Sequence, residues 1–238
     1  MITIDYKRLN ILPGDRVLDM GCGPGRHVSA ACADYDATVV GADINIADLV
    51  QAKTNIYAHE AFGGKLRGRW GLSAADITAL PFPDKAFDHV ICAEVMEHIP
   101  DDRQAAAELN RVLKPGGSLT VSVPRFFPEK ICWTLSSRYC NTEGGHIRIY
   151  TKAEIVSIFK NMGLKKRCSH YAHSIHTPYW WIRCLAGPDN DTALPVKIYQ
   201  RFLTWDIMQK PKLTRTIDAM LNPVMGKSLV VYFRKDSR

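Results

Sequence analysis

A glycine-rich turn between an apolar run and a helix-forming run constrains the fold of this chain more than any other feature. Residues 17–20 predict a short buried strand, the loop 21–25 reads Gly-Cys-Gly-Pro-Gly, and residues 28–33 predict the start of a helix. Because glycine has no Cβ, such a loop can turn sharply and approach a ligand closely, and the start of a helix offers free N–H groups. The pattern predicts an α/β sheet with a site for a nucleotide-like cofactor.

An acidic residue follows the second predicted strand at an informative distance. Residues 38–42 are apolar enough for a strand, and Asp43 ends it 18 residues after Gly25. An acid at that distance can accept hydrogen bonds from two ribose hydroxyls. The alternative is a helix N-cap, because residues 47–52 have a helical pattern. The glycine turn and the acid occur together, which favours the ribose interpretation.

Three further segments continue the alternation of strands and turns. Residues 75–77 read Ala-Asp-Ile, so that an acid and an aliphatic side chain could bond and flank an adenine ring. Residues 87–93 predict a strand that runs into residues 94–99, and residues 113–117 predict a turn before a strand at 118–123.

Over residues 13 to 123, this series of motifs resembles that of class I S-adenosylmethionine-dependent methyltransferases. The resemblance implies a Rossmann-like α/β fold: a seven-stranded, mostly parallel sheet whose last strand is antiparallel, with helices on both faces. It implies S-adenosylmethionine as cofactor, bound by Asp19, Gly21, Cys22, Gly23, Gly25, Asp43, Ile44, Asp76, Ile77 and Glu94. The signature Glu94-x-x-Glu97-His98 is similar to that of the broad subgroup acting on quinones, sterols, sugars and other small molecules.

Composition restricts the class of protein. The 238 residues are 46% apolar, which suits one globular domain with a buried core, and no run of 18 apolar residues predicts a membrane-spanning helix. The mixed and charged residues 1–10 do not resemble a signal peptide. Seven cysteines without a C-x-x-C pair indicate a reduced, cytoplasmic protein.

Charge is divided unevenly along the chain. Residues 1–123 carry 12 Lys and Arg against 16 Asp and Glu, whereas residues 124–238 carry 19 against 8. The basic half predicts an anionic partner, either a phosphorylated or carboxylated substrate or the inner face of an anionic membrane. Nucleic acid is less favoured because the chain shows no added RNA-binding module. A solvated basic face that only aids solubility is the alternative.

The second half predicts one domain with two substrate-side insertions, at about 124–149 and 173–226. Between them, Thr151 and Glu154 form a capping-box pattern at the start of a helix. Strands are expected at 164–171 and 227–234, and helical stripes near 178, 196–209 and 213–221. Since few residues precede the first strand, we expect these insertions to form the lid over the substrate.

Histidine is the usual base near neutral pH, and three residues are candidates for acting on the acceptor. His98 follows the fourth strand, and His146 and Tyr150 follow a glycine pair at the end of the first insertion. We expect these residues to be catalytic and no metal to be bound. Two alternatives stay open: His146 and Tyr150 could pack and cap the next helix, or Glu94, Glu97, His98 and His146 could hold a divalent ion.

The sequence therefore predicts methyl transfer to a small molecule, apolar or lipid-like with a hydroxyl or anionic group, on oxygen or carbon. An RNA methyltransferase and a non-catalytic cofactor- or partner-binding module are the alternatives. The acceptor and the oligomeric state stay open. No Asp/Asn-Pro-Pro-Tyr/Phe segment follows the fourth strand, which argues against methylation of exocyclic base amines.

Overall fold

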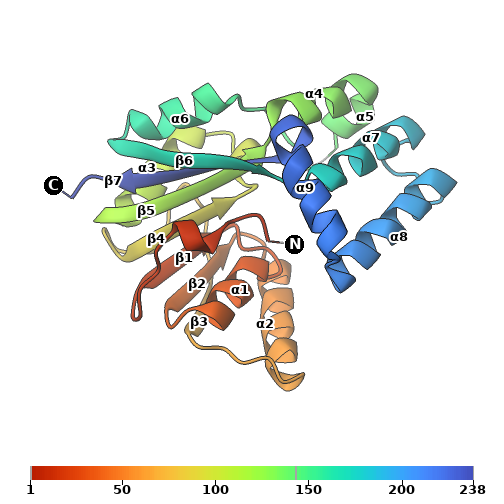
Figure 1. Ribbon diagram of the computed structural model, residues 1–238. Coiled ribbons are helices and arrows are strands. Elements are labelled where there is room, and N and C mark those ends of the chain that lie inside the picture. Colours follow the sequence, from red (N-terminus) through yellow and green to blue (C-terminus); the bar gives the residue numbers. More distant parts are fainter. Residues whose placement is uncertain (1, 143, 238) are drawn as a thin grey trace.

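The computed structural model describes residues 2–142 and 144–237, which form a seven-stranded sheet flanked by helices (Figure 1). The strands are β1 (Arg16–Met20), β2 (Thr38–Asp43), β3 (Arg69–Ala74), β4 (Phe87–Ala93), β5 (Leu113–Pro124), β6 (Leu164–Ala172) and β7 (Ser228–Lys235). Their order is β3-β2-β1-β4-β5-β7-β6. Neighbouring strands from β3 to β5 are parallel, and β7 runs antiparallel to both β5 and β6. The predicted mostly parallel sheet with an antiparallel last strand is confirmed.

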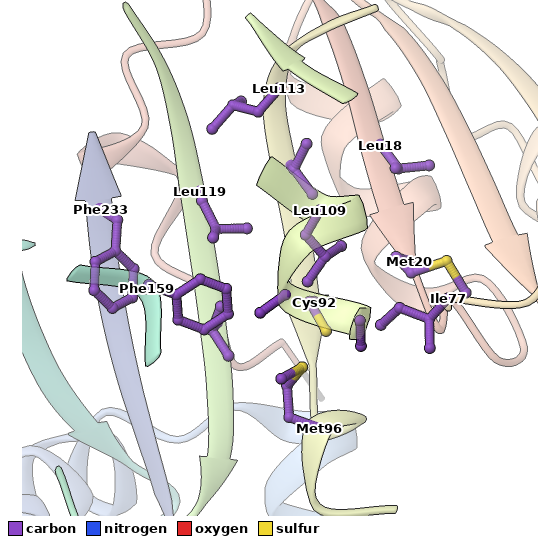
Figure 2. Packing of buried hydrophobic residues seen from close by; sticks show 14 of the residues in the cluster. Leu18, Met20, Ile77, Cys92, Met96, Leu109, Leu113, Leu119, Phe159 and Phe233 are labelled. Atoms are coloured by element: carbon purple, nitrogen blue, oxygen red, sulfur yellow. The ribbon is translucent and has the colours of Figure 1, made fainter. Parts of the chain in front are cut away.

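Helices cover both faces of the sheet, as its two apolar clusters show. The helices that pack on it are α1 (Arg26–Asp34), α2 (Ile46–Ala61), α3 (Asp102–Val112) and α6 (Lys152–Lys160). Along β1, Val17 faces the cluster under α1 and α2, whereas Leu18 and Met20 face the cluster under α3 and α6. Figure 2 shows this second cluster, with Leu109 of α3 against the strands. Burial on both faces is typical of parallel strands, which explains their continuous apolar runs.

The turn expected at 113–117 is present as an irregularity within a longer strand, β5. β5 already begins at Leu113, which pairs with Phe87, and the next pair joins Ser118 to His89. The four residues between these partners bulge out of the ladder, and Gly116 takes a left-handed conformation there, with φ +72°. The bulge lets β5 pair on both sides of the turn, so the strand is longer than its apolar run.

Both insertions are helical and gather at one end of the sheet (Figure 1). The first contains α4 (Phe126–Leu135) and α5 (Ser137–Cys140), and the second contains α7 (Thr177–Ala186), α8 (Leu194–Gln209) and α9 (Lys212–Met225). They follow β5 and β6, so they stand beyond the carboxyl ends of parallel strands, where open α/β sheets bind ligands. The capping box of Thr151 and Glu154 at the start of α6 is confirmed.

Candidate functional site

The glycine loop between β1 and α1 is packed tightly at both ends and open in its middle. Gly21 and Gly25 have left-handed backbones, with φ +73° and +80°. A Cβ at Gly21 would lie 2.2 Å from Val95 Cγ2, and one at Gly25 would lie 2.9 Å from Ala52 Cβ. A Cβ at Gly23 would meet nothing within 4 Å. The loop therefore needs glycine to pack at its ends, and its centre faces free space that a ligand can enter.

Asp43 ties the end of β2 to this loop. Its Oδ2 accepts a hydrogen bond from the Gly23 N–H at 2.8 Å, and its Oδ1 accepts one from the Asn45 N–H at 2.9 Å. The N-cap of α2 is Asn45, whose side chain accepts from the Ala47 N–H, so the N-cap alternative for Asp43 is wrong. The carboxylate of Asp43 lies beside the open centre of the loop, with lone pairs left for a ligand.

Asp19 is a buried carboxyl group without a hydrogen-bond partner among the described residues. Its side chain is 1% exposed, and neither carboxylate oxygen makes a hydrogen bond within the described residues. Burial raises the pKa of Asp19 to about 7, with a smaller contribution from Asp43 and an opposing one from Arg26. A buried carboxylate left unpaired is costly, so this position suits a ligand that brings a cation or a hydrogen-bond donor.

The other expected cofactor residues differ in accessibility. Asp76 is exposed, and its Oδ1 accepts hydrogen bonds from the N–H and O–H of Thr78, which lower the pKa of Asp76. Ile77 is only 3% exposed and lies in the core near Met20 (Figure 2). Its side chain therefore faces the core, and only its backbone is left to face a ligand. Ile44, which is 70% exposed, is an accessible aliphatic side chain next to Asp43.

Glu94 adopts a backbone conformation that is rare outside glycine. Its φ is +59°, its N–H donates to the Ser122 carbonyl at 2.9 Å, and its Oε1 accepts from the Ser122 hydroxyl at 2.8 Å. A left-handed residue held by a neighbouring strand is a frequent feature of functional sites. Glu94 directly precedes Val95, the residue that packs against Gly21, so it borders the glycine loop.

A cavity of about 370 Å³ lies between the end of β4 and the two insertions. Its wall combines aromatic, imidazole and cationic side chains, among them His98, Tyr139, His146, Trp180, Arg183 and Lys227. Lys227 Nζ lies 5.1 Å from the Trp180 ring centre, and the Arg183 guanidinium bonds Asp191 and the Tyr179 hydroxyl. The volume is that of a small-molecule site.

The two histidines of the cavity are held by their Nδ1 atoms. His98 Nδ1 lies 3.1 Å from the Gly145 carbonyl oxygen, and His146 Nδ1 lies 2.6 Å from Glu129 Oε1. The rings meet edge to face with centroids 4.9 Å apart, and burial together with His146 lowers the pKa of His98. Each Nε2 lies 3.9 Å from Glu97 Oε1. The structure therefore brings the side chains of His98 and His146 into contact, next to the carboxyl group of Glu97.

Two buried carboxyl groups stand behind these rings. Glu97 is fully buried, neither of its carboxyl oxygens has a hydrogen-bond partner within the described residues, and burial with Glu94 nearby raises its pKa well above the usual range. Burial acts to raise the pKa of Glu129 too, but the His146 hydrogen bond and Lys227 bring it below the usual value. Glu129 is therefore the charged partner that orients His146.

Tyr150 lies away from this cavity. Its side chain is 5% exposed, and its hydroxyl donates to Asp102 Oδ2 at 2.6 Å, the same carboxylate that pairs with Arg148. Burial and the Asp102 hydrogen bond raise the pKa of Tyr150. The structure therefore does not join Tyr150 to His98 and His146, and its contacts anchor the segment before α6 to the start of α3.

Sequence reasoning missed two residues of this site, Glu129 and Lys227. Glu129 lies in the first turn of α4, and Lys227 directly precedes β7, almost 100 residues later. Neither belongs to a motif, so only their closeness in the folded chain identifies them. The neighbouring tryptophans of α7 differ in position: Trp180 lines the cavity, whereas the Trp181 indole donates to the Pro128 carbonyl.

Comparison with known proteins shows that the first half of the chain is similar to methyltransferases. Residues 18–121 match the family model described as "Methyltransferase domain". The chain is 35% identical over 117 residues to Methyltransferase GfsG of Streptomyces halstedii, covering 49% of this chain and 40% of that protein. It is 32% identical over 182 residues to Sterol methyltransferase-like 2 of Botryococcus braunii, covering 71% and 44%. The chain thus spans less than half the length of these two curated relatives.

The whole described fold also has a counterpart among solved structures. Phosphoethanolamine N-methyltransferase 2 of Haemonchus contortus, in complex with S-adenosyl-L-methionine, matches with a TM-score of 0.61 and 18% identity. The match covers 97% of this chain and 51% of that one. At this identity the likeness shows the fold, which is the one implied by the motifs.

The buried Asp19 carboxyl makes the stability of the unliganded protein depend on pH. An unfolded Asp titrates near about 4, whereas the folded one titrates at about 7. Between these values only the folded chain holds the proton, so stability falls as pH rises from about 4 to about 7 and is then level. Asp19→Asn should remove this loss and be more stable than the parent, by a margin that grows across this window.

Urea unfolding at several pH values checks this expectation. Asp34→Asn, at the exposed end of α1, serves as control and should follow the parent. A margin for Asp19→Asn that does not change between mildly acidic and neutral pH would show that Asp19 is ionised in the folded protein throughout.

Proposed function

We propose that the chain is a class I S-adenosylmethionine-dependent methyltransferase that methylates a small molecule bound in the cavity of His98 and His146; the match of residues 18–121 to a methyltransferase domain supports this. One observation carries the proposal. Val95 packs against Gly21 of the open glycine loop, and its carbonyl accepts the His98 N–H at 2.9 Å. A single short segment therefore borders both the cofactor crevice and the cavity, as transfer between two bound molecules requires.

The residues of the crevice fit S-adenosylmethionine by their chemistry. When bound, this cofactor supplies an electrophilic methyl group on a sulfonium. Asp43 would accept the ribose hydroxyls, and the unpartnered Asp19 would face the positive charge of the cofactor. Exposed Ile44 and Asp76 would border the adenine, and the N–H groups of the loop 21–25 would bind polar atoms of the amino acid part. Glu94 would close this crevice on the side of β4.

The cavity favours an acceptor with an apolar body and an anionic or hydroxyl group. Tyr139 and Trp180 offer aromatic surface, and Lys227 offers a cation that has no carboxylate within ion-pair distance among the described residues. This fits a lipid-like substrate, the class named by the sterol methyltransferase relative. A cavity volume of about 370 Å³ suits a small molecule, which favours this class of acceptor over RNA, the main alternative.

His98 and His146 are the groups that act on the reacting atom of the acceptor. Their Nδ1 atoms are occupied, so their Nε2 atoms are free to serve a hydroxyl, an enol or an acidic carbon. Tyr150 is a positioning residue in this scheme, since its hydrogen bond to Asp102 holds the chain between His146 and α6. The insertions form the lid, and α7 contributes Trp180 and Arg183 to it.

We expect Asp43→Ala to weaken S-adenosylmethionine binding. A carboxylate bonded to ribose hydroxyls is worth roughly 1.5–3 kcal/mol, or about 10- to 150-fold in affinity. Calorimetric titration of the folded variant checks this, with Asp34→Ala as the control that keeps the parent affinity. Unchanged affinity in Asp43→Ala would remove Asp43 from the cofactor site.

We expect His146→Ala to lower kcat by roughly 10²- to 10⁴-fold, the usual contribution of a group that assists proton removal. Affinity for S-adenosylmethionine should stay within about twofold of the parent, since the cofactor residues lie in the first half of the chain. Formation of S-adenosylhomocysteine with phenol, quinol and sterol acceptors provides the assay. The matched control is His59→Ala, which removes an exposed histidine of α2. If no acceptor is turned over by the parent, the non-catalytic alternative is favoured instead.

The hairpin of α8 and α9 favours contact with an anionic membrane. Figure 1 shows both helices projecting beyond the sheet. Large apolar side chains are exposed on them, including Ile198, Trp205, Met208, Leu213, Met220 and Val224. Cations stand beside them, whereas the acids Asp206 and Asp218 are bonded within the protein, to Arg215 and Ser174. Apolar residues flanked by unpaired cations fit the surface of an anionic bilayer.

This contact is peripheral: within residues 2–142 and 144–237, no helix combines the length and apolar character needed to cross a bilayer. We expect the protein to co-sediment with vesicles containing about 30% phosphatidylserine at low salt, and to be released as salt rises. Reversing two cations of α8, in Lys197→Glu with Arg201→Glu, should weaken binding at least about 30-fold, at about 1 kcal/mol for each charge.

The matched control is the double reversal Lys160→Glu with Lys166→Glu, which changes the net charge equally on α6 and β6. It should bind nearly as tightly as the parent. Equal loss in both double variants would mean that net charge alone attracts the protein, and equal binding to neutral vesicles would exclude an anionic partner.

A further inference from the structure

We propose that Glu97, His98 and His146 bind a divalent transition-metal ion at the inner end of the cavity. A carboxyl oxygen of Glu97 and one nitrogen of each histidine lie within 4.8 Å of one another. His98 Nε2 and His146 Nε2 are both 3.9 Å from Glu97 Oε1. Ligands bound about 2.1 Å from one ion stand about 3–3.5 Å apart, so binding needs an inward movement of less than about 1 Å.

The hydrogen bonds of the two rings prepare them as metal ligands. A carbonyl oxygen can only accept, so His98 Nδ1 donates to Gly145 and the Nε2 of the neutral ring carries a lone pair. His146 Nδ1 donates to the carboxylate of Glu129 in the same way. Metal-binding histidines usually show this arrangement, with the second nitrogen bonded to a carbonyl or carboxylate that fixes the tautomer. Each Nε2 atom therefore carries a lone pair and lies 3.9 Å from Glu97 Oε1.

The buried carboxyl group of Glu97 supports the metal site independently of the two histidines. Its side chain is 0% exposed and neither oxygen has a hydrogen-bond partner among the described residues. Its position is held by the backbone, since the Ile147 N–H donates to the Glu97 carbonyl at 3.1 Å. A buried carboxyl without a partner is costly, and a cation between it and the two imidazoles would offset that cost.

The charge and ligand types select the class of ion. Glu97 interacts electrostatically with two further carboxyl groups, those of Glu94 and Glu129, and with one cation, Lys227. The excess of carboxyl groups favours a divalent cation. Two imidazoles and one carboxylate suit Zn²⁺, Mn²⁺ or Fe²⁺ better than Mg²⁺ or Ca²⁺, which prefer oxygen. Three protein ligands leave a coordination position open toward the cavity, as in catalytic rather than structural sites.

The inference rests on the proposed function only for the role of the ion. An acceptor hydroxyl that coordinates the open position would lose its proton to water at a lower pH. The oxygen would then form its bond to the methyl carbon as the carbon–sulfur bond breaks, and the sulfonium would become a thioether. This role refines the proposed function: the Nε2 atoms of His98 and His146 would hold the ion, and the two histidines would assist proton loss from the acceptor through it instead of contacting the acceptor directly.

Binding of Mn²⁺ to the chelator-treated full-length protein tests the site. Mn²⁺ is chosen because the free cysteines, such as Cys132 and Cys184, would compete for the softer Zn²⁺. Electron paramagnetic resonance of free Mn²⁺ should show one ion bound for each chain. Glu97→Gln and His146→Ala should weaken binding at least about 10-fold, and Glu129→Gln, which keeps all three ligands, about 10- to 100-fold. His59→Ala should bind as the parent does.

Two outcomes overturn the proposal: no saturable Mn²⁺ binding to the parent, or parent-like binding by Glu97→Gln that still binds S-adenosylmethionine and is therefore folded. Turnover separates this failure from that of the proposed function. If chelator-treated protein methylates its acceptor at the full rate, the metal site is wrong and the methyltransferase proposal stands. If Mn²⁺ binds but S-adenosylmethionine does not, the proposed function fails and the metal site remains.

Discussion

The contact between Gly21 and Val95 is the constraint on which the rest of the site depends. A side chain at position 21 would overlap Val95, so the glycine loop after β1 and the segment after β4 approach more closely than other residues would allow. That approach sets the cofactor crevice beside the residues that lead to His98. The same loop is held on its other side by Gly25 against Ala52 and by Asp43 bonded to the Gly23 N–H. Close backbone packing thus holds together the carboxyl ends of three inner strands, β1, β2 and β4.

Two buried carboxyl groups mark the two halves of the site. Asp19 stands behind the glycine loop and Glu97 behind the histidine pair, and within the described residues neither has a hydrogen-bond partner. An isolated carboxyl in a protein interior lowers stability, so such groups persist where a ligand uses them. Around them, apolar clusters fill both faces of the sheet. The stability lost at the two carboxyl groups is therefore offset by extensive apolar packing elsewhere (Figure 2).

The motif-bearing half of the chain was predicted well because its signals are local. Strand β1, the glycine turn and the start of α1 follow one another in sequence, and the capping box of Thr151 depends on Glu154 only three residues away. Predictions of side-chain direction were weaker. Ile77 and Tyr150 were placed in crevice and cavity, but the packing of the core and the carboxylate of Asp102 turn both inward. The direction of a side chain depends on residues that are distant in sequence, and a local sequence pattern gives no information about them.

The sequence by itself determined the fold class, and it predicted the cofactor crevice at the glycine loop and the two helical segments after β5 and β6. These follow from glycine spacing and apolar periodicity, which act over a few residues. Only the tertiary structure decided that α4 supplies Glu129 to His146, that Lys227 enters the cavity from the start of β7, and that His98 and His146 converge on Glu97. These residues are separated by up to 130 positions along the chain. Their meeting depends on strand order and helix packing, because no local interaction links them.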